Sequence, residues 1–267
     1  MKKGTHLFII DPQNDFAKVG GSLFVPGADK DMARLAAMVK NNIKQIKTIT
    51  VTLDSHNDFH IAHPVFTADS TGKHPAPFTE ITHADVVAGK FRGFRPDFTK
   101  ELLDYTAALE KAGKYKLMVW PPHCLIGTPG HCVVDELNES FREWTAVKGR
   151  NIDFVTKGSN PYTEHYGAVM AEVERNDDAG TKLNEKLVKD LQNTGDDDIL
   201  IAGEALSHCV ANTIRQVADT FTADQIKKFV LLTDACSNVT GCDFLGDAFV
   251  KEMTGRGMRT ATTATYF

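Results

Sequence analysis

Residues 197–222 read DDILIAGEALSHCVANTIRQVADTFT, and this stretch decides the fold class. The apolar run within 197–202 is typical of a strand that is buried on both faces. Gly203 interrupts the run, and a helical pattern follows over 208–222. A strand that leads through a glycine turn into a helix is the repeating unit of α/β proteins with a parallel sheet.

The same alternation recurs along the chain. It predicts a single α/β domain over residues 1–267, with a doubly wound, mostly parallel six-stranded sheet and helices on both faces. The expected strands cover 6–10, 48–53, 115–119, 152–156, 197–202 and 228–232, with a weaker seventh at 258–262. The expected helices cover 28–46, 98–113, 132–146, 163–175, 182–193, 208–222 and 242–255. The segment 57–97 has little periodicity, so we expect a long loop that acts as a lid or an oligomer contact.

Composition excludes several classes of protein. With 42% hydrophobic and 24% charged residues among 267, collagen-like, coiled-coil and disordered chains are excluded. The net charge of −5 and the lack of a basic stripe predict no nucleic-acid partner. No apolar run reaches the ~20 residues that span a bilayer, and we find no signal peptide, so we expect no membrane partner. The five cysteines include no CxxC pair, which predicts reduced thiols in a cytoplasmic protein.

Chemically active side chains follow five of the predicted strands. Ligands of open parallel sheets bind beyond the carboxyl ends of the strands, where all of these side chains would lie. In order along the chain, the side chains after the five strands are Asp11, then Asp54 and His56, then His123 and Cys124, then Lys157, and finally Cys209. The sequence therefore predicts an acid, a set of metal donors, a lysine and a cysteine at one edge of the sheet.

Cys209 is the candidate nucleophile. It lies near the start of an expected helix, where N–H groups and partial positive charge stabilise a thiolate and lower the thiol pKa. A buried structural cysteine is the alternative, and it is the role we expect for Cys236 and Cys242. Asp11 and Lys157 are the candidate proton acceptor and positive neighbour, since each ends a strand that can lie beside the strand before Cys209. The alternatives are a turn residue for Asp11 and a surface lysine for Lys157.

Asp54, His56 and His123 are candidate metal ligands. Asp54 and His56 are two positions apart, so an extended chain points both side chains to the same side. One carboxylate and two imidazoles leave coordination positions open, as in catalytic zinc and iron sites. A structural role for the Asp54–His56 pair stays open. For the other histidines of comparable interest we expect non-ligand roles: His60, His63, His74, His83 and His131.

Five motifs together resemble the nicotinamidase/isochorismatase-like cysteine hydrolases, and are closest to nicotinamidases. They are IDPQNDF at 10–16, DSH at 54–56, WPPHCLIGTPG at 120–130, VTKG at 155–158 and GEALSHCV at 203–210. The resemblance implies an isochorismatase-like fold and hydrolysis of a small, planar amide through a cysteine thioester. Nicotinamide, cleaved to nicotinate and ammonia, is the implied lead substrate. A homo-oligomer is also implied.

The resemblance further implies a catalytic triad of Asp11, Lys157 and Cys209. Asp11 would accept the thiol proton, Lys157 would favour the thiolate, and the sulfur of Cys209 would attack the amide carbonyl. A cis peptide bond is implied between Glu204 and Ala205. It would aim the N–H of Ala205, together with that of Cys209, at the developing oxyanion.

By the same resemblance, Asp54, His56 and His123 hold one divalent metal ion, with Zn²⁺ as the default and iron or manganese as alternatives. In nicotinamidases the metal binds the pyridine nitrogen of the substrate. The chain departs from the family at Asp54-Ser-His56-Asn57, where nicotinamidases commonly have DWHP, so hydrolysis is better supported than the substrate. The tentative substrate contacts, each with core packing or helix capping as the alternative, are Phe16, Trp120 and Tyr166.

Other functions stay open at this point. Isochorismatase-like vinyl-ether hydrolysis, or hydrolysis of another small amide or carbamoyl compound, would use the same fold. A non-catalytic binding module would keep the pocket, but it would be expected to lose Asp11, Lys157 or Cys209, and all three are present. The chain has no P-loop, GxGxxG, GxSxG or HExxH motif, which disfavours nucleotide-dependent and serine-hydrolase readings.

Overall fold

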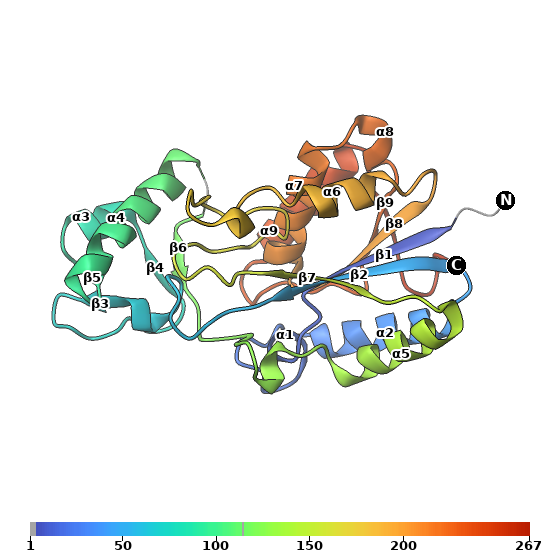
Figure 1. The fold of residues 1–267 in the computed structure, drawn as a ribbon, viewed down its shortest axis with the longest axis horizontal. Coiled ribbons are helices and arrows are strands. Elements are labelled where there is room, and N and C mark those ends of the chain that lie inside the picture. The colour runs from blue at the N-terminus through green and yellow to red at the C-terminus, as the bar shows by residue number, and fades with distance from the viewer. Residues whose placement is uncertain (1–3, 114) are drawn as a thin grey trace.

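The computed structural model describes residues 4–113 and 115–267. Its main sheet has six parallel strands within that part of the chain, in the order β10-β9-β8-β1-β2-β7 (Figure 1). The strands are β1 (Thr5–Ile10), β2 (Ile46–Asp54), β7 (Asp153–Lys157), β8 (Asp198–Gly203), β9 (Phe229–Leu232) and β10 (Arg259–Ala261). The prediction of a doubly wound α/β fold with a parallel sheet is confirmed.

The apolar runs of the sequence form the centre of this sheet. Every residue of β8 is buried, and β1 pairs with it in register from Thr5 opposite Asp198 to Ile10 opposite Gly203. Gly203 has a φ of 120°, and a Cβ there would lie 2.0 Å from the Ile10 oxygen. Only glycine allows this approach, and it brings the turn after β8 against the end of β1.

Helices cover both faces of the sheet, as Figure 1 shows. Leu7 and Ile9 of β1 pack in the cluster that holds α2 (Ala28–Asn41) and α5 (Asp135–Lys148). Phe8 and Ile10 point to the other face, whose cluster includes side chains of α6, α7, α8 and α9. The helices on this second face are α6 (Glu185–Gln192), α7 (Ala211–Asp219), α8 (Ala223–Ile226) and α9 (Asp243–Gly255). Each fully buried Leu or Ile side chain contributes roughly 1.5–3 kcal/mol to folding.

A small lobe lies beyond the carboxyl ends of the central strands, at the left of Figure 1. It has its own core, in which Phe66, Leu102 and Trp120 are buried. The segment 57–97, expected as a structureless loop, forms much of this lobe; its role as a lid or oligomer contact stays a prediction. The elements of the lobe are a 3₁₀ turn (Pro64–Phe66), β3 (Thr67–Asp69), β4 (Thr79–Ile81), α3 (His83–Val87), β5 (Phe91–Gly93), α4 (Pro96–Lys111) and β6 (Leu117–Val119).

Two of the predicted elements are wrong. The strand expected at 115–119 became β6, which pairs antiparallel with β4 in the small lobe, while β10 is the sixth strand of the main sheet. A short apolar run does not specify its pairing partner. The helix expected over 163–175 is absent from this described segment, because side chains of α7 bind its backbone: Gln216 Oε1 accepts from the N–H groups of Val169 and Met170.

The helix expected over 208–222 starts as a π-helical turn, Leu206–Val210, and continues as α7. The other expected helices match α2, α4, α5, α6 and α9 apart from their ends. Short elements complete the description: α1 (Asn14–Ala17) and two 3₁₀ turns, Pro129–His131 and Ala179–Thr181. In the described part of the chain, no helix combines the length and apolar character that crossing a bilayer requires.

Candidate active site

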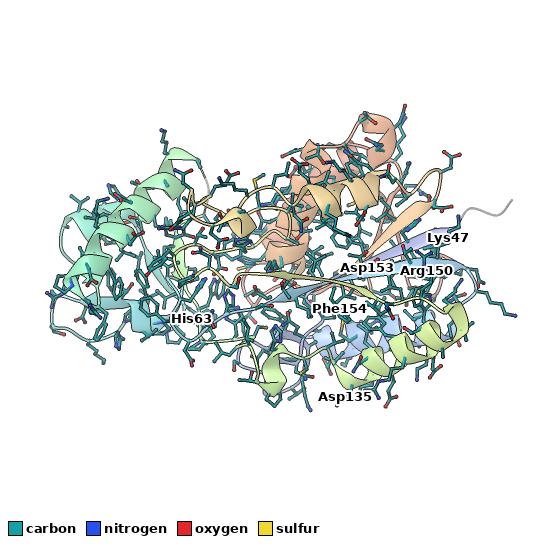
Figure 2. All side chains as sticks on the ribbon, viewed as in Figure 1. Lys47, His63, Asp135, Arg150, Asp153 and Phe154 are labelled. Carbon is teal, nitrogen blue, oxygen red and sulfur yellow. The ribbon has the colours of Figure 1, made fainter. Side chains whose placement is uncertain are left out.

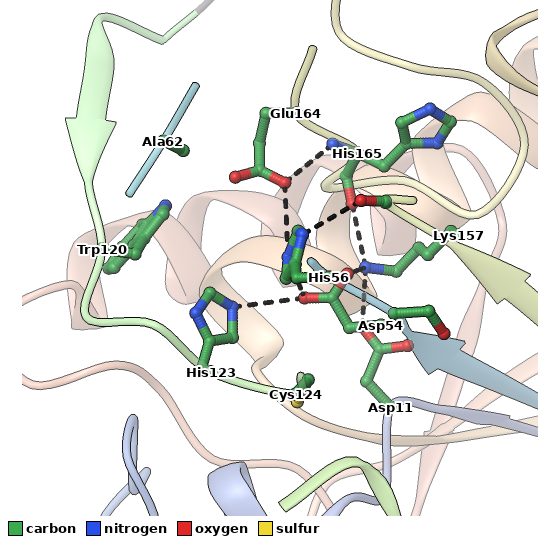
Figure 3. A network of polar contacts seen from close by, with 12 residues as sticks. Asp11, Asp54, His56, Ala62, Trp120, His123, Cys124, Lys157, Glu164 and His165 are labelled. Atoms are coloured by element: carbon green, nitrogen blue, oxygen red, sulfur yellow. Dashed lines mark hydrogen bonds and ion pairs between the residues drawn. The ribbon is translucent and has the colours of Figure 1, made fainter. Parts of the chain in front are cut away.

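The structure brings Asp11, Lys157 and Cys209 together at the carboxyl edge of the sheet. Figure 3 shows Lys157 beside Asp11 and Asp54. The Nζ atom of Lys157 lies 2.9 Å from Asp11 Oδ2 and 3.7 Å from Cys209 Sγ. Strand register explains the meeting: Lys157 ends β7 opposite Asp54 at the end of β2. Asp11 directly follows β1, and its backbone N–H donates to the carbonyl of Thr52.

Lys157 is a buried ammonium surrounded by acceptors. Besides Asp11 it contacts Asp54 Oδ1 at 3.0 Å and the carbonyl of His165 at 2.9 Å. Burial opposes the charge, but the carboxylates of Asp11 and Asp54 prevail and hold the pKa of Lys157 well above its ordinary value. The lysine therefore stays positive beside the sulfur of Cys209.

The thiol of Cys209 does not have the low pKa that its position before a helix predicts. Burial is the largest effect and raises the pKa of Cys209 well above its ordinary value, and the Asp11 and Asp54 carboxylates add to it, although Lys157 lowers it. Cys209 is only 7% exposed and lies in the π-helical turn ahead of α7. At rest, burial therefore favours the neutral thiol over the thiolate.

Asp11 is placed to take the thiol proton. It is fully buried, and burial raises its pKa even though Lys157 and the hydroxyl of Thr52 favour the charged form. A carboxyl group with a raised pKa is a better proton acceptor, since the ideal catalytic pKa lies nearer to neutral pH. Lys157 Nζ contacts both Asp11 Oδ2 and Cys209 Sγ, so the carboxyl group lies close to the thiol.

Asp54, His56 and His123 form a compact donor set. The Oδ2 atom of Asp54 lies 3.0 Å from His56 Nε2 and 3.3 Å from His123 Nε2, and all three side chains are buried. The other ring nitrogens, both Nδ1, face the carbonyls of Gly158 and Pro121 at 3.0 and 2.8 Å. In a neutral ring Nε2 then carries the lone pair that a metal requires.

Electrostatics and packing also fit a cation at this place. Burial opposes ionisation of Asp54, but His56 and Lys157 prevail and hold the pKa of Asp54 well below its ordinary value. Burial likewise opposes a charge on His56, yet the Asp54 carboxylate raises the pKa of this imidazole. Gly158 has a φ of 86°, and a Cβ there would lie 2.8 Å from Asp54 Oδ1. Glycine therefore keeps the space beside the donor set open.

The structure adds histidines for which we expected non-ligand roles. His56, His60 and His63 lie close enough for one ion to reach a ring nitrogen of each. His60 uses both nitrogens, Nε2 toward the Thr163 carbonyl and Nδ1 toward the Ala62 N–H. The sequence did contain a local signal, because three histidines and two aspartates fall within residues 54–63.

His63 differs from His60 in having a nitrogen to spare. Its Nδ1 faces the carbonyl of Asp58 at 3.1 Å, whereas Nε2 is buried and has no hydrogen-bond partner among the described residues. Burial, with His56 and His123, lowers the pKa of His63 to about 3, so the ring is neutral. It lies at the opposite end of the sheet from Lys47, beside the small lobe (Figure 2).

The remaining histidines of the prediction lie outside this cluster. His131 Nε2 contacts the hydroxyl of Ser55 at 2.8 Å, and His74 and His83 belong to the small lobe.

The sulfur of Cys209 opens onto a pocket with about 380 Å³ of space not filled by atoms, part of it open to solvent. All three tentative substrate contacts line it: Phe16, Trp120 and Tyr166. Trp120 Nε1 donates to the Tyr166 hydroxyl at 3.1 Å, which fixes both rings. Glu164, which follows Lys157 in sequence, also lines the pocket, and the lining residues that the sequence did not indicate include Leu23, Val25, His208 and Val239.

The turn before the nucleophile forms another wall. The peptide bond between Glu204 and Ala205 is cis, and Ala205 lines the pocket beside Cys209. The carbonyl of Ala205 accepts from the N–H groups of His208 and Val210, at 3.0 and 3.1 Å. The arrangement can present backbone N–H groups to a carbonyl held above the sulfur, which is the chemistry of acyl transfer.

Comparison with known proteins points to one family. No family model matches the chain. It is 25% identical to the nicotinamidase of Saccharomyces cerevisiae over 213 residues, which cover 80% of this chain and 81% of that protein. It is 28% identical to the nicotinamidase/pyrazinamidase of Mycobacterium tuberculosis over 207 residues, which cover 78% and 75%.

Solved structures show the same fold. The yeast nicotinamidase structure matches with a TM-score of 0.65 at 20% identity, covering 96% of this chain and 99% of that one. The pyrazinamidase of Pyrococcus horikoshii in complex with zinc matches with a TM-score of 0.58 at 20% identity, covering 97% and 98%.

Proposed function

We propose that the chain, which resembles nicotinamidases over most of its length, is an amidohydrolase of the nicotinamidase/isochorismatase-like family that acts on a small, planar amide. The lead substrate is nicotinamide, which would give nicotinate and ammonia. One observation carries the proposal: a thiol, an ammonium and a carboxyl group meet within hydrogen-bonding reach at a pocket lined by aromatic side chains.

The first half of the reaction is acyl transfer to sulfur. Phe16 and Trp120 would hold the planar ring so that the amide carbonyl lies over Cys209. Asp11 takes the thiol proton as the sulfur attacks, and Lys157 stabilises the charge that develops. The N–H groups of Ala205 and Cys209 would donate to the tetrahedral oxyanion. Asp11 then returns the proton to the departing ammonia, which leaves a thioester.

The second half regenerates the enzyme. Asp11, now ionised, takes a proton from water, and the hydroxide attacks the thioester carbonyl. The same N–H groups hold the second oxyanion. When it collapses, the carboxylic acid leaves and the proton returns to the sulfur of Cys209. The balance is one amide and one water converted to one acid and one ammonia.

We also propose one divalent metal ion, Zn²⁺ by default, held by Asp54, His56 and His123. The donor set supports it, because two Nε2 atoms converge on one carboxylate oxygen while carbonyls hold the opposite nitrogens. His63 Nε2, buried without a described partner, is the further nitrogen that such an ion would satisfy. When bound, the ion would supply a positive centre that orients a ring nitrogen of the substrate.

Ammonia release over a panel of amides tests the function. Nicotinamide and pyrazinamide carry a ring nitrogen and benzamide does not, so we expect the first two to react faster, and chelation to slow them most. Cys209→Ala should lower turnover by about 10³-fold or more. Cys132→Ala is the matched control, since Cys132 is exposed. Full activity of Cys209→Ala would contradict the thioester mechanism.

Two finer features stay proposals. A cytoplasmic location rests on the free cysteines of the chain, and a homo-oligomer rests on the family resemblance alone. The thiol beside Lys157 and Asp11 counts against vinyl-ether hydrolysis, which has no need of a thiol.

A further inference from the structure

A second buried carboxyl pair lies beside the active site, and the mechanism does not use it. Glu204 is fully buried and directly precedes Ala205, whose N–H is aimed at the oxyanion in the proposed mechanism. Asp31, in the first turn of α2, is 2% exposed. Two acids buried together are costly unless their hydrogen bonds compensate for the lost water.

Ser237 connects these acids to the turn that carries Ala205. Its backbone N–H donates to Glu204 Oε2 at 3.1 Å, and its hydroxyl donates to Asp31 Oδ2. Its carbonyl accepts from the N–H of Leu206 at 2.8 Å. Ser237 therefore holds the residue before Ala205 through a side chain and the residue after it through the backbone.

The main chain of Glu204 is fixed as well. Its N–H donates to the carbonyl of Ile10 at 2.8 Å, which ties the turn to the end of β1. With Ser237 bound to Glu204 Oε2, the residue has anchors at the backbone and at the end of the side chain. The plane of the peptide between Glu204 and Ala205, and with it the direction of the Ala205 N–H, depends on both anchors.

The environment of the Glu204 side chain favours its neutral, protonated form. Its other oxygen, Oε1, is buried and has no hydrogen-bond partner among the described residues. Burial is the main cause that raises the pKa of Glu204 well above its ordinary value, and the nearby Asp31 carboxylate adds to it. Arg34 pairs with Asp31, and not with Glu204 in any described contact.

We propose that Glu204 and Ser237 are positioning residues for the oxyanion hole: through their shared hydrogen bond they fix the direction of the Ala205 N–H. They act on the transition state and not on binding of the amide. This inference rests on the proposed function, because it assigns the two residues to that reaction.

Glu204→Met and Glu204→Gln form the test pair. Methionine keeps the approximate volume but cannot accept from Ser237 N–H, whereas glutamine keeps a neutral acceptor. Loss of a complete oxyanion donor costs about 10²–10³-fold in kcat, so a misdirected donor should cost roughly 10–100-fold. We expect this loss of kcat in Glu204→Met with KM changed less than about threefold, and near wild-type kcat in Glu204→Gln.

The aldehyde analogue of the lead substrate supplies a second readout. Nicotinaldehyde forms a C–S bond to the thiol of Cys209, the thiol proton moves to Asp11, and the aldehyde oxygen becomes an oxyanion in the hole. Its inhibition constant should rise in Glu204→Met by about the same factor as kcat falls, while the Kd of nicotinate stays within about threefold. If Glu204 had a purely structural role, Glu204→Met would weaken the binding of nicotinaldehyde and of nicotinate by similar factors.

Ser237→Ala keeps the inference testable if Glu204→Met does not fold. It removes the hydroxyl bond to Asp31 and loosens the shared anchor, so kcat and nicotinaldehyde affinity should fall by roughly 3–10-fold. Ser140→Ala is the control, because the buried Ser140 hydroxyl donates to the Leu137 carbonyl within α5, away from this turn. Wild-type kcat and aldehyde affinity in Ser237→Ala would rule out the Ser237 side chain as part of the anchor, since alanine keeps the backbone N–H that donates to Glu204.

The outcomes separate this inference from the function. If Glu204→Met folds and keeps wild-type kcat and aldehyde affinity, or changes only KM, the inference is wrong while amide hydrolysis stands. If the wild-type enzyme releases no ammonia from any amide, the proposed function fails. The aldehyde series then still decides the inference, since it needs only the thiol and the oxyanion hole.

Discussion

Two buried carboxyl pairs at the same edge of the sheet are neutralised in different ways. Asp11 and Asp54 share the ammonium of Lys157, which contacts a carboxylate oxygen of each at 2.9 and 3.0 Å. Glu204 and Asp31 have no buried lysine among their described contacts, and the pKa of Glu204 is held well above its ordinary value, mainly by burial and then by Asp31. Lys157 supplies a fixed cation to the first pair, whereas in the second pair burial favours the protonated form of Glu204 and Asp31 pairs with Arg34.

The difference follows from what each pair does. The Asp11 carboxyl must gain and lose a proton in every turnover, so a permanent neighbouring charge is useful there. Glu204 only has to hold a backbone turn in place, and a proton on it removes the need for a neighbouring cation. The following variants test whether the two pairs are neutralised as described.

Lys157→Met should have the largest effect. It removes the only described cation that contacts both Asp11 and Asp54, and breaking a buried ion pair on one side costs about 3–5 kcal/mol. We expect activity to be lost together with that stability, measured by ammonia release and by denaturant unfolding. Lys40→Met, which removes an exposed ion pair to Glu143, is the control and should change stability by less than about 1 kcal/mol.

His63→Ala should weaken metal binding at the proposed site of Asp54, His56 and His123. Loss of a partner at a metal site typically costs 10–100-fold in affinity, so we expect roughly 10-fold weaker binding in a chelator competition with Zn²⁺. His74→Ala is the control, because His74 is exposed and lies in the small lobe. Equal Zn²⁺ affinity in both variants would show that the spare nitrogen of His63 is not a ligand.

Glu204→Gln should change how stability depends on pH. Because the pKa of Glu204 is raised in the folded state, the folded protein binds more protons than the unfolded chain above pH 4.5, the ordinary value. The contribution of Glu204 to the free energy of unfolding of the wild type is therefore lost as pH rises above 4.5. Asp31, Arg34 and Cys236 face the same place.

The measurement is denaturant unfolding of both proteins at pH 5 and pH 8. We expect the variant to gain stability relative to the wild type as pH rises. A difference that is the same at both pH values would mean that Glu204 is ionised in the folded protein, and the contrast between the two pairs would disappear.

Arg34→Met should have the smallest effect. The Arg34 side chain is 42% exposed, and water screens its ion pair with Asp31, so we expect a loss of at most about 1 kcal/mol in denaturant unfolding. Asp31 keeps the hydroxyl bond from Ser237. A loss comparable with that of Lys157→Met would show that a cation, and not a proton, neutralises the second pair.

The positions of the chemically active residues were predictable from the sequence. Asp11, Asp54, Lys157 and Cys209 each follow an apolar run, and the carboxyl ends of parallel strands meet at one edge of a sheet. The local pattern therefore indicated which side chains gather, without any knowledge of distances. The same reasoning placed His123 correctly at the carboxyl edge of the sheet, although the strand before His123 belongs to the small lobe.

Other features depend on contacts that no local pattern contains. The helix expected over 163–175 failed because Gln216, some 46 positions later, binds the backbone of Met170. The thiol of Cys209 has a raised pKa because tertiary packing buries it beside two carboxylates. A sequence position before a helix indicates only the opposite effect.

The sequence by itself determined the order of strands and helices along the chain and the chemical groups at each strand end, since both depend on neighbouring residues. Only the tertiary structure decided which groups share a proton, which nitrogen of His63 is left over, and that Ser237 holds Glu204. These depend on burial and on distances between segments far apart in the chain. Desolvation acts over the assembled core, so no local stretch of residues can specify it.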